Sequence, residues 1–302
     1  MTHAPTIHVP VLAAEAVAWL AVRPGLVIVD GTVGGGGHTR ILSELVGEDG
    51  LVIGLDRDSG SLQAVRTRLP TANVRLVHAN FCDLPDVLRE LELPAVDGVL
   101  LDLGLSSDQL ADHERGFSFD AAGPLDLRFD TTTGRPAWQL IEQMRAEPLA
   151  DLIYEFGEER FSRRIARAIV ETRRQEPIRT AAQLATLVRR CVPRGRHERI
   201  DPATRTFQAL RIAVNEELQS LTLALQRVPD CLRPGGRMVV ISFHSLEDRL
   251  VKHAFRADPR WTVLTKKPVR PGDLEVAQNP RSRSALLRAA ERTAELTAET
   301  KS

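Results

Sequence analysis

The sequence predicts an α/β protein with a doubly wound sheet that is interrupted by an all-helical insert. Short apolar runs alternate with helical periods over the first hundred residues, and a glycine-rich loop follows the first run. From about residue 112 to residue 211 no segment has the pattern of a buried strand. A βαβαβ alternation requires a parallel sheet with right-handed crossovers. We therefore expect a discontinuous domain of residues 1–111 and 212–302, and a helical domain of residues 112–211.

The first hundred residues contain four apolar runs that end near an acid or an amide. The predicted strands are Leu26–Asp30, Leu51–Asp56, Val74–Ala79 and Val96–Leu103. The predicted helices between them are Thr39–Leu45, Ser59–Leu69 and Leu84–Leu91. Ligands of doubly wound sheets bind beyond the carboxyl ends of the strands. Asp30, Asp56, Asn80 and Asp102 fall at these ends and are candidate ligand contacts.

The rest of the chain supplies the insert and the remaining strands. In the insert, apolar residues recur at helical spacing, as in Phe161–Ile169, and the arginines lie on other faces. The strand pattern resumes after Arg233-Pro234-Gly235-Gly236, where we expect a turn. The further predicted elements are a strand at Arg237–Phe243, a helix at Leu246–Phe255, and strands at Trp261–Leu264 and Ser284–Ala290. We expect the chain beyond Arg292 to fray.

Composition excludes several classes of protein. The chain has 302 residues, of which 43% are hydrophobic and 26% charged, as in a soluble globular protein. It contains no run of about 18 apolar residues that would cross a membrane, and its first ten residues do not resemble a secretory signal. The three cysteines, Cys82, Cys191 and Cys231, are widely separated, which favours a reduced, cytoplasmic setting. No cysteine or histidine spacing indicates a metal site.

A formal net charge of zero hides a basic segment. Residues 155–211 contain fourteen arginines, no lysine and seven acidic residues, a net charge of +7, so the rest of the chain carries −7. Such a segment indicates a surface for nucleic acid. The alternative is a solvated helical face in which arginine serves as a good helix former.

The loop after the first predicted strand indicates a nucleotide cofactor. Asp30 precedes Gly31, and Gly34–Gly37 lead into a helix. Glycines allow positive φ and close approach of a ligand, and the helix N-terminus offers free N–H groups. Asp56, 19 positions after Gly37, fits an acid that accepts hydrogen bonds from ribose hydroxyls. The acid before the loop and the shifted glycines favour S-adenosylmethionine; a nicotinamide cofactor and a turn needed only for packing are the alternatives.

The end of the fourth predicted strand carries candidate catalytic residues. Methyl transfer to the exocyclic amine of a base requires donor and acceptor to be lined up. A carboxylate or hydroxyl that accepts from the amine N–H would assist it. Asp102, Ser106 and Ser107 are of the right types, although a serine here could instead cap the next helix. His244, after a later strand, is either a proton acceptor or a structural residue.

A series of segments matches a known family in the same order along the chain, from about His8 to Thr293. The segments are Asp30-Gly31-Thr32-x-Gly34-x-Gly36-Gly37-His38, Leu101-Asp102-Leu103-Gly104-x-Ser106-Ser107-x-Gln109, Arg115-Gly116-Phe117-Ser118-Phe119, Gly123-Pro124-Leu125-Asp126, Gly157-Glu158-Glu159-Arg160-Phe161, Pro202-Ala203-Thr204-Arg205-Thr206-Phe207-Gln208, Ser242-Phe243-His244-Ser245-Leu246-Glu247-Asp248-Arg249 and Asn279-Pro280-Arg281-Ser282-Arg283-Ser284. On these segments the chain resembles the bacterial small-subunit (16S) ribosomal RNA cytosine-N4-methyltransferases, formerly described as cell-division-cluster methyltransferases.

The resemblance implies a Rossmann-like class I methyltransferase sheet and S-adenosyl-L-methionine as cofactor. It also implies methylation of the exocyclic N4 of a cytidine in the decoding region of 16S rRNA, with an inserted helical domain that recognises RNA. The cofactor contacts of the family fall on Gly36, Gly37, His38, Asp56, Phe81, Asp102 and Gln109. Arg163, Arg164, Arg167, Arg173 and Arg174 would then hold phosphates.

Amino-group DNA methyltransferases, a related group, carry Ser/Asp-Pro-Pro-aromatic where this chain has Asp102-Leu103-Gly104-Leu105. Their stacking ring therefore does not transfer to this chain, and Phe117, Phe119 or Trp138 would have to supply one. Two other functions are compatible with the pattern, a non-catalytic RNA-binding or assembly protein and a small-molecule methyltransferase whose insert is a lid. The sequence leaves open whether free rRNA or the small ribosomal subunit is the substrate, and whether the chain forms a homo-oligomer.

Overall fold

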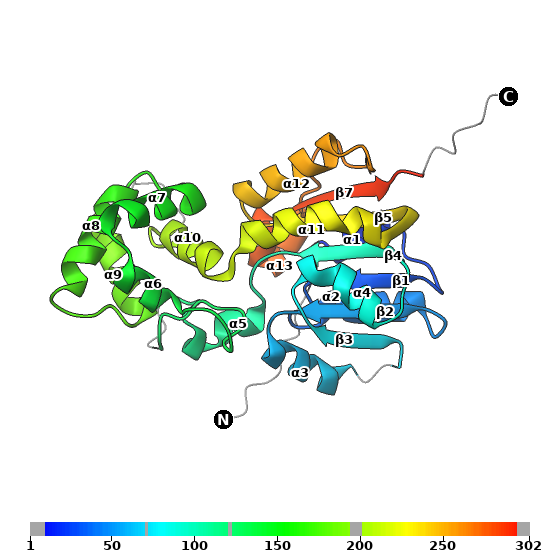
Figure 1. Cartoon of the computed structure of the whole chain (residues 1–302), viewed down its shortest axis with the longest axis horizontal. Coiled ribbons are helices and arrows are strands. Elements are labelled where there is room, and N and C mark those ends of the chain that lie inside the picture. The colour runs from blue at the N-terminus through cyan, green and yellow to red at the C-terminus, as the bar shows by residue number, and fades with distance from the viewer. Residues whose placement is uncertain (1–9, 70–71, 120–122, 194–200, 295–302) are drawn as a thin grey trace. The chain divides into compact units, whose positions relative to one another are not determined.

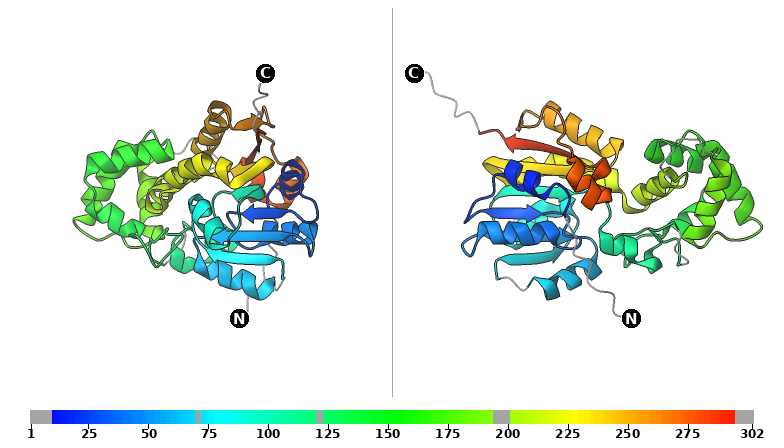
Figure 2. Two further views of the ribbon diagram at one scale, coloured as in Figure 1. Left: turned by 45° about the vertical axis from the view of Figure 1, so that its right-hand side comes forward. Right: turned by 180° about the vertical axis from the view of Figure 1, so that it is seen from behind.

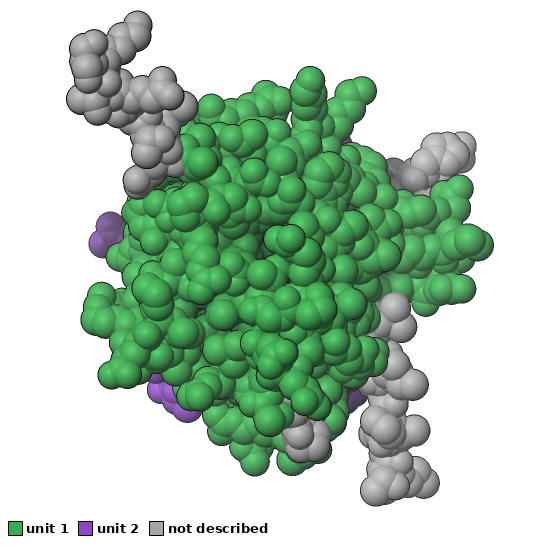
Figure 3. Space-filling view, turned by 90° about the vertical axis from the view of Figure 1, so that its right-hand side faces the viewer, with its two compact units in different colours: residues 1–104, 219–302 green, residues 105–218 purple. Residues whose placement is uncertain are grey.

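The computed structural model describes residues 10–69, 72–119, 123–193 and 201–294, and within them not the side chain of Ser107. The chain forms two compact units (Figure 3): unit 1 contains residues 1–104 and 219–302, and unit 2 contains residues 105–218. Unit 2 is longer at both ends than the expected insert of residues 112–211. At the start, Leu105 and Leu110 pack against the core of the helical unit, and at the end Arg211 pairs with Glu217 at 2.8 Å.

Unit 1 is built on a seven-stranded sheet in the order β3-β2-β1-β4-β5-β7-β6. The strands are β1 Val27–Asp30, β2 Leu51–Asp56, β3 Val74–His78, β4 Val96–Asp102, β5 Leu232–Ser242, β6 Trp261–Val263 and β7 Leu286–Arg292. The first four agree with the predicted strands to within one residue at each end. β7 runs antiparallel to β5 and β6. The apolar pattern does not reveal strand direction, so this reversal was not predicted.

Helices cover both faces of this sheet (Figures 1 and 2). The helices of unit 1 are α1 Ala13–Leu20, α2 Gly37–Val46, α3 Ser59–Arg68, α4 Leu84–Glu90, α11 Glu217–Cys231, which starts at the boundary with unit 2, α12 Ser245–Ala257 and α13 Asp273–Gln278. Alternate residues of each strand point to opposite faces of the sheet. Val29 and Leu101 therefore face α4, α11 and α12, whereas Ile28 and Leu100 face α1 and α2. The short 3₁₀ segments are η1 Phe81–Asp83 and η3 Pro280–Ser284. Such coverage buries both faces of a parallel sheet.

The expected turn at Arg233–Gly236 lies inside β5. Pairing with β4 passes from Val96↔Leu232 to Gly98↔Arg237, so five residues of β5 advance against two of β4. The intervening residues therefore loop out as a bulge, with Gly235 at a φ of +79°. Because the strand pairs on both sides of the bulge, it begins earlier than the sequence pattern indicates.

Unit 2 is helical around its own core. Its helices are α5 Ser107–Ala111, α6 Ala137–Gln143, α7 Ala146–Gly157, α8 Ser162–Arg173, α9 Ala181–Cys191 and α10 Thr204–Asn215, with the 3₁₀ segment η2 His113–Arg115. Ile165 and Ile169 of α8 are fully buried in this core, as the helical spacing predicted. Arg194, Arg196 and Arg199 of the basic segment, and the tail beyond residue 294, lie outside the described residues.

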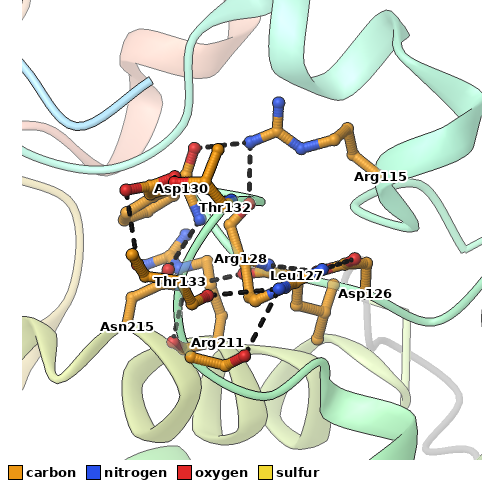
Figure 4. Close-up of polar contacts among 11 residues, drawn as sticks. Arg115, Asp126, Leu127, Arg128, Asp130, Thr132, Thr133, Arg211 and Asn215 are labelled. Atoms are coloured by element: carbon orange, nitrogen blue, oxygen red, sulfur yellow. Dashed lines mark hydrogen bonds and ion pairs between the residues drawn. The ribbon is translucent and has the colours of Figure 1, made fainter. Parts of the chain in front are cut away.

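The loop between η2 and α6 is held by polar contacts with α10 (Figure 4). Leu127 has a φ of +64°, which is costly for a bulky side chain. The carbonyl of Leu127 accepts a hydrogen bond from Asn215 Nδ2 at 2.7 Å, and Asn215 Oδ1 accepts one from Phe129 N–H at 2.7 Å. The Arg115 guanidinium donates to the carbonyls of Arg128 and Phe129 at 2.7 and 2.8 Å. These bonds fix the strained residue in place.

Within the described residues, no helix combines the length and the apolar character needed to cross a bilayer.

Candidate active site

Asp30 fixes both ends of the glycine loop. Its side chain is fully buried at the end of β1. Oδ1 accepts a hydrogen bond from Thr32 N–H at 3.1 Å, and Oδ2 accepts one from Thr39 Oγ1 at 2.7 Å. Burial raises the pKa of Asp30, whereas nearby His38 lowers it. Asp30 therefore braces the loop and α2, and each of its carboxylate oxygens is already bonded within the fold.

The loop itself turns through two left-handed glycines. Gly34 has a φ of +49° and Gly36 a φ of +81°, conformations that other residues adopt only at a cost. A Cβ at Gly36 would also lie 3.0 Å from Val65 Cγ2. α2 then begins at Gly37, so the unpaired N–H groups of its first turn face the loop. Gly36, Gly37 and His38 thus lie at this loop–helix junction.

Asp56, at the end of β2, is bound to the same loop. Its Oδ2 accepts a hydrogen bond from Gly34 N–H at 2.7 Å, and its Oδ1 accepts one from Asp58 N–H at 2.8 Å. Burial raises the pKa of Asp56 to about 6, even though these two N–H donors oppose the rise. Each carboxylate oxygen has a further lone pair. Asp56 can therefore still accept hydrogen bonds from a ligand, and it titrates close to neutral pH.

His38 connects the ends of β1 and β4. Its ring is buried, and Nε2 lies 3.4 Å from Asp102 Oδ2. Burial is the strongest effect on the His38 pKa and lowers it, but the Asp102 and Asp30 carboxylates outweigh burial, so the pKa of His38 is raised overall. The carbonyl of Val11 also accepts a hydrogen bond from the ring. The imidazole is thus placed between two carboxylates.

Asp102 ends β4 with an unused acceptor. Its backbone N–H donates to Thr32 Oγ1 at 2.7 Å. Its side chain is only 14% exposed, and among the described residues the buried Oδ1 has no hydrogen-bond partner. An unpartnered buried carboxylate oxygen costs about 1–3 kcal/mol or more. Oδ1 is therefore well suited to accept a hydrogen bond from a ligand.

Phe81 starts η1, directly after β3. Its neighbour Asn80 caps η1 through Oδ1, which accepts from Cys82 N–H at 3.3 Å, and Asn80 Nδ2 donates to Ser220 Oγ at 2.9 Å. A Cβ at Gly31 would lie 3.0 Å from Phe81 Cβ, so the half-buried ring begins next to the glycine loop. The structure therefore brings six of the sequence-predicted cofactor residues to one edge of the sheet in unit 1.

The remaining predicted residues, Ser106, Ser107 and Gln109, belong to unit 2. Ser106 is the N-cap of α5: its Oγ accepts from Gln109 N–H at 3.1 Å, while Gln109 Oε1 accepts from Ser106 N–H at 3.0 Å. This is a reciprocal capping box. Ser106 therefore caps a helix, which was the alternative to a catalytic role. The side chain of Ser107 lies outside the described part of the chain.

Replacing Ser106 tests the cap directly. We expect Ser106→Ala to lower the free energy of unfolding by about 1 kcal/mol, and Ser106→Asn to restore most of it because asparagine also caps helices. Urea denaturation and turnover would be measured for both variants. A catalytic role for the hydroxyl would appear as an Asn variant of normal stability with slow turnover.

His244 is also a capping residue. Its Nδ1 accepts from Glu247 N–H at 3.4 Å at the start of α12, and Glu247 Oε2 accepts from Phe243 N–H at 2.8 Å. The His244 Nε2 lies 3.1 Å from Glu247 Oε1. These contacts favour the structural role over the catalytic one.

The three candidate stacking rings pack within unit 2. Phe117 is buried and stacks on Phe129 with ring centroids 5.9 Å apart. Phe119 contacts Phe207 edge to face at 5.0 Å. The Arg179 guanidinium lies 4.0 Å from the Trp138 ring centroid. Because these rings contribute to the core of the helical unit, the structure offers no support for a stacking role.

Sequence reasoning missed Thr32. Its hydroxyl ties the loop to β4, because Asp102 N–H donates to it, while its own N–H donates to Asp30. A threonine inside a glycine loop was the available signal. The contact of its hydroxyl with β4 depends on the pairing of β1 with β4, and the sequence does not predict which strands pair.

Comparisons with known proteins identify the family of this chain. The model of the MraW methylase family matches residues 5–293. "Ribosomal RNA small subunit methyltransferase H" of Rhodopirellula baltica is 50% identical, over 96% of this chain and 92% of the relative. The proteins of the same name from Thermomicrobium roseum and Geobacter sulfurreducens are each 49% identical, over 96% and 94% of this chain and 94% and 98% of the relatives.

One conclusion follows from the strand order β3-β2-β1-β4-β5-β7-β6, the acid-flanked glycine loop and the family match over nearly the whole length. This chain belongs to the MraW methylase family.

Proposed function

We propose that this chain uses S-adenosyl-L-methionine to methylate the exocyclic N4 of a cytidine in the decoding region of 16S rRNA. Membership of a methylase family makes it a methyltransferase, and its relatives are named for the RNA of the small ribosomal subunit. The observation that carries the proposal is the buried, unpartnered Oδ1 of Asp102 at the end of β4, at the same edge of the sheet as the glycine loop. This activity would take place in the cytoplasm, where small subunits are assembled.

The residues around the glycine loop would hold the donor, whose sulfonium supplies an activated methyl group. Asp56 would accept hydrogen bonds from the ribose hydroxyls. Phe81 would contact the adenine, and the N–H groups at the start of α2, near Gly36–His38, would attract the carboxylate. Asp102 and Gln109 complete the contacts implied by the resemblance, although the Oε1 of Gln109 is used within α5.

Asp102 would act on the acceptor amine. The lone pair of N4 is delocalised into the cytosine ring, so the amine is a weak nucleophile. A carboxylate that accepts from its N–H favours the pyramidal nitrogen that can attack the methyl carbon, and it takes up the proton after the N–C bond has formed and the C–S bond has broken. His38, 3.4 Å from Oδ2, would hold this carboxylate in place. Ser106 and Ser107 are further candidates to accept a hydrogen bond from N4, and turnover of the Ser106→Asn variant tests the first of them.

Donor binding should depend on pH through Asp56. Because burial raises its pKa to about 6, the carboxylate is present above pH 6 and is lost as the pH falls through 6. We expect the Kd for the donor to rise by about tenfold per pH unit below that value. Isothermal titration calorimetry between pH 5 and pH 8 measures this. Asp56→Asn should bind the donor weakly at every pH, and a wild-type slope that persisted in this variant would mean that His38 or Asp30 titrates instead.

The RNA would contact unit 2 through a surface on α8 and the residue that follows it, which we call the α8 arginine surface. It consists of Arg163, Arg164, Arg167 and Arg174, all exposed and without an ion pair among the described residues. Arg173 is different, because it is half-buried and donates to the carbonyl of Ile141. We therefore leave Arg173 out of the phosphate-binding set that the sequence suggested.

Three other arginines of the basic segment are paired with acids within unit 2. Arg189 bonds Asp201 at 2.7 Å, Arg179 bonds Glu142 at 2.5 Å, and Arg211 bonds Glu217 at 2.8 Å. Their charges are balanced locally, so they add little to the attraction of phosphates. Arg160, Arg190 and Arg205 are exposed as well, but the α8 arginine surface groups four exposed arginines on one helix and the residue that follows it.

Two measurements test the proposed function. Mass mapping of 16S rRNA from cells that lack this protein should show one cytidine without its N4 methyl group. Purified protein should bind the donor in calorimetry and transfer its methyl group to small subunits or to their rRNA. Donor binding without transfer would favour a non-catalytic RNA-binding protein, and transfer to free nucleosides would favour a small-molecule methyltransferase.

A further inference from the structure

The segment Asn279–Ser284 has no role in the function described so far, yet the fold places it at the site. β7 is antiparallel to β5, with Leu286 opposite Ser242, so the amino end of β7 lies at the edge where the parallel strands end. η3 immediately precedes β7 and therefore lies at that edge. In the strand order, β7 is separated from β1 and β2 by β4 and β5. The segment thus lies on the side of Asp102 opposite to the glycine loop.

Arg281 is the half-buried arginine of this segment, in η3 at the edge of the sheet where β4 ends. The segment is fixed by Ser282, which is fully buried and donates from Oγ to the carbonyl of Asn279 at 2.8 Å. Burial lowers the pKa of Arg281, and the charge of Asp102 opposes that decrease, so the guanidinium lies within electrostatic range of this carboxylate. Arg283, two residues later, is exposed.

A carboxylate and a guanidinium at the same edge of the sheet offer a base one acceptor and one donor. The Watson–Crick edge of cytosine has the complementary order, with the N4 amine as donor and ring N3 as acceptor. Uracil has the reverse order, a carbonyl followed by an N–H. Enzymes that act on an extruded base read this edge through hydrogen bonds. Arginine cannot lose its proton in proteins, so it remains a donor.

We propose that Arg281 is a specificity-determining residue that donates a hydrogen bond to ring N3 of the target cytosine, while Asp102 Oδ1 accepts one from N4. This inference rests on the proposed function. It deepens that function by stating how the site distinguishes cytosine from uracil. The donor is held on the other side of Asp102, so donor binding does not require Arg281.

The test compares Arg281→Met with the matched control Arg283→Met. Methionine keeps most of the apolar stem of arginine and removes the guanidinium. With RNA that contains the target cytidine, Arg281→Met should lower kcat/KM by about 10- to 100-fold, the value of one good contact to a base edge. Arg283→Met should stay close to wild type, and calorimetry should show an unchanged Kd for the donor in both variants.

A modified substrate separates base reading from a structural effect. RNA with 3-deazacytidine at the target position lacks the N3 acceptor but keeps the N4 amine. This change should slow the wild-type enzyme by the same factor as Arg281→Met and should slow the variant no further. Equal losses in Arg281→Met and Arg283→Met, or additive losses from variant and analogue, would overturn the assignment. Absence of N4 methylation by the wild-type enzyme would instead overturn the proposed function.

Discussion

Asp102→Asn is expected to slow methyl transfer by about 10²- to 10⁴-fold when donor and RNA are both saturating, the range of general acid–base catalysis. Asparagine keeps the shape of the side chain but cannot take up the proton that N4 loses. The buried Oδ1 of Asp102 has no other hydrogen-bond partner among the described residues. Single-turnover transfer of a labelled methyl group to small subunits measures the rate of this step.

Two further readouts distinguish the reaction from donor binding. If Asp102 only held the donor, Asp102→Asn would raise the Kd for the donor and leave the rate at saturation unchanged, contrary to the expected result. The variant should also lower the pKa of His38, because the Asp102 carboxylate raises that pKa in the wild type. NMR titration of the His38 ring would show this shift. It would also confirm that the folded site persists.

Reversal of three charges on the α8 arginine surface is expected to have the second large effect. The variant Arg163→Glu/Arg164→Glu/Arg167→Glu should weaken RNA binding by about 10²- to 10³-fold near 0.1 M salt and reduce the slope of log K against log salt by about 2 to 3. Each phosphate contact contributes about 0.7–0.9 to that slope through release of counterions. These side chains are exposed, so the fold should persist. Fluorescence anisotropy over a series of salt concentrations measures both quantities.

A matched control separates the α8 arginine surface from net charge. Lys266→Glu/Lys267→Glu/Arg270→Glu makes the same change in charge at exposed positions of unit 1. This control should weaken binding much less. Equal losses of affinity and slope in the two variants would mean that the total charge of the protein, and not the α8 arginine surface, attracts the RNA.

Much of the candidate site follows from local patterns. The strands that end at Asp30, Asp56 and Asp102 are short apolar runs, and a parallel sheet necessarily brings their carboxyl ends to one edge. The glycine loop is equally local, because left-handed backbone at Gly34 and Gly36 requires residues without a Cβ. Strand alternation, the loop and the acid at Asp56 were therefore predictable without tertiary information.

Two examples show what local patterns could not predict. Arg173 and Arg174 are neighbours in a basic run, yet Arg173 donates to the Ile141 carbonyl and Arg174 is exposed. Ser106 was a candidate for the reaction, and its hydroxyl accepts from Gln109 N–H in a helix cap. In both cases the outcome depends on which backbone group lies within hydrogen-bond distance. Packing decides this, and residue type does not.

Periodicity and backbone conformation along the chain were enough to predict the class of sheet, the helical insert and the acids that rim the glycine loop. The antiparallel direction of β7 emerged from the fold alone, and it places Arg281 at the edge of the sheet that carries Asp102, 179 positions away in the chain. Strand direction and side-chain partners are set by long-range hydrogen bonds and burial. The spacing of neighbouring residues does not depend on those interactions and therefore does not reveal them.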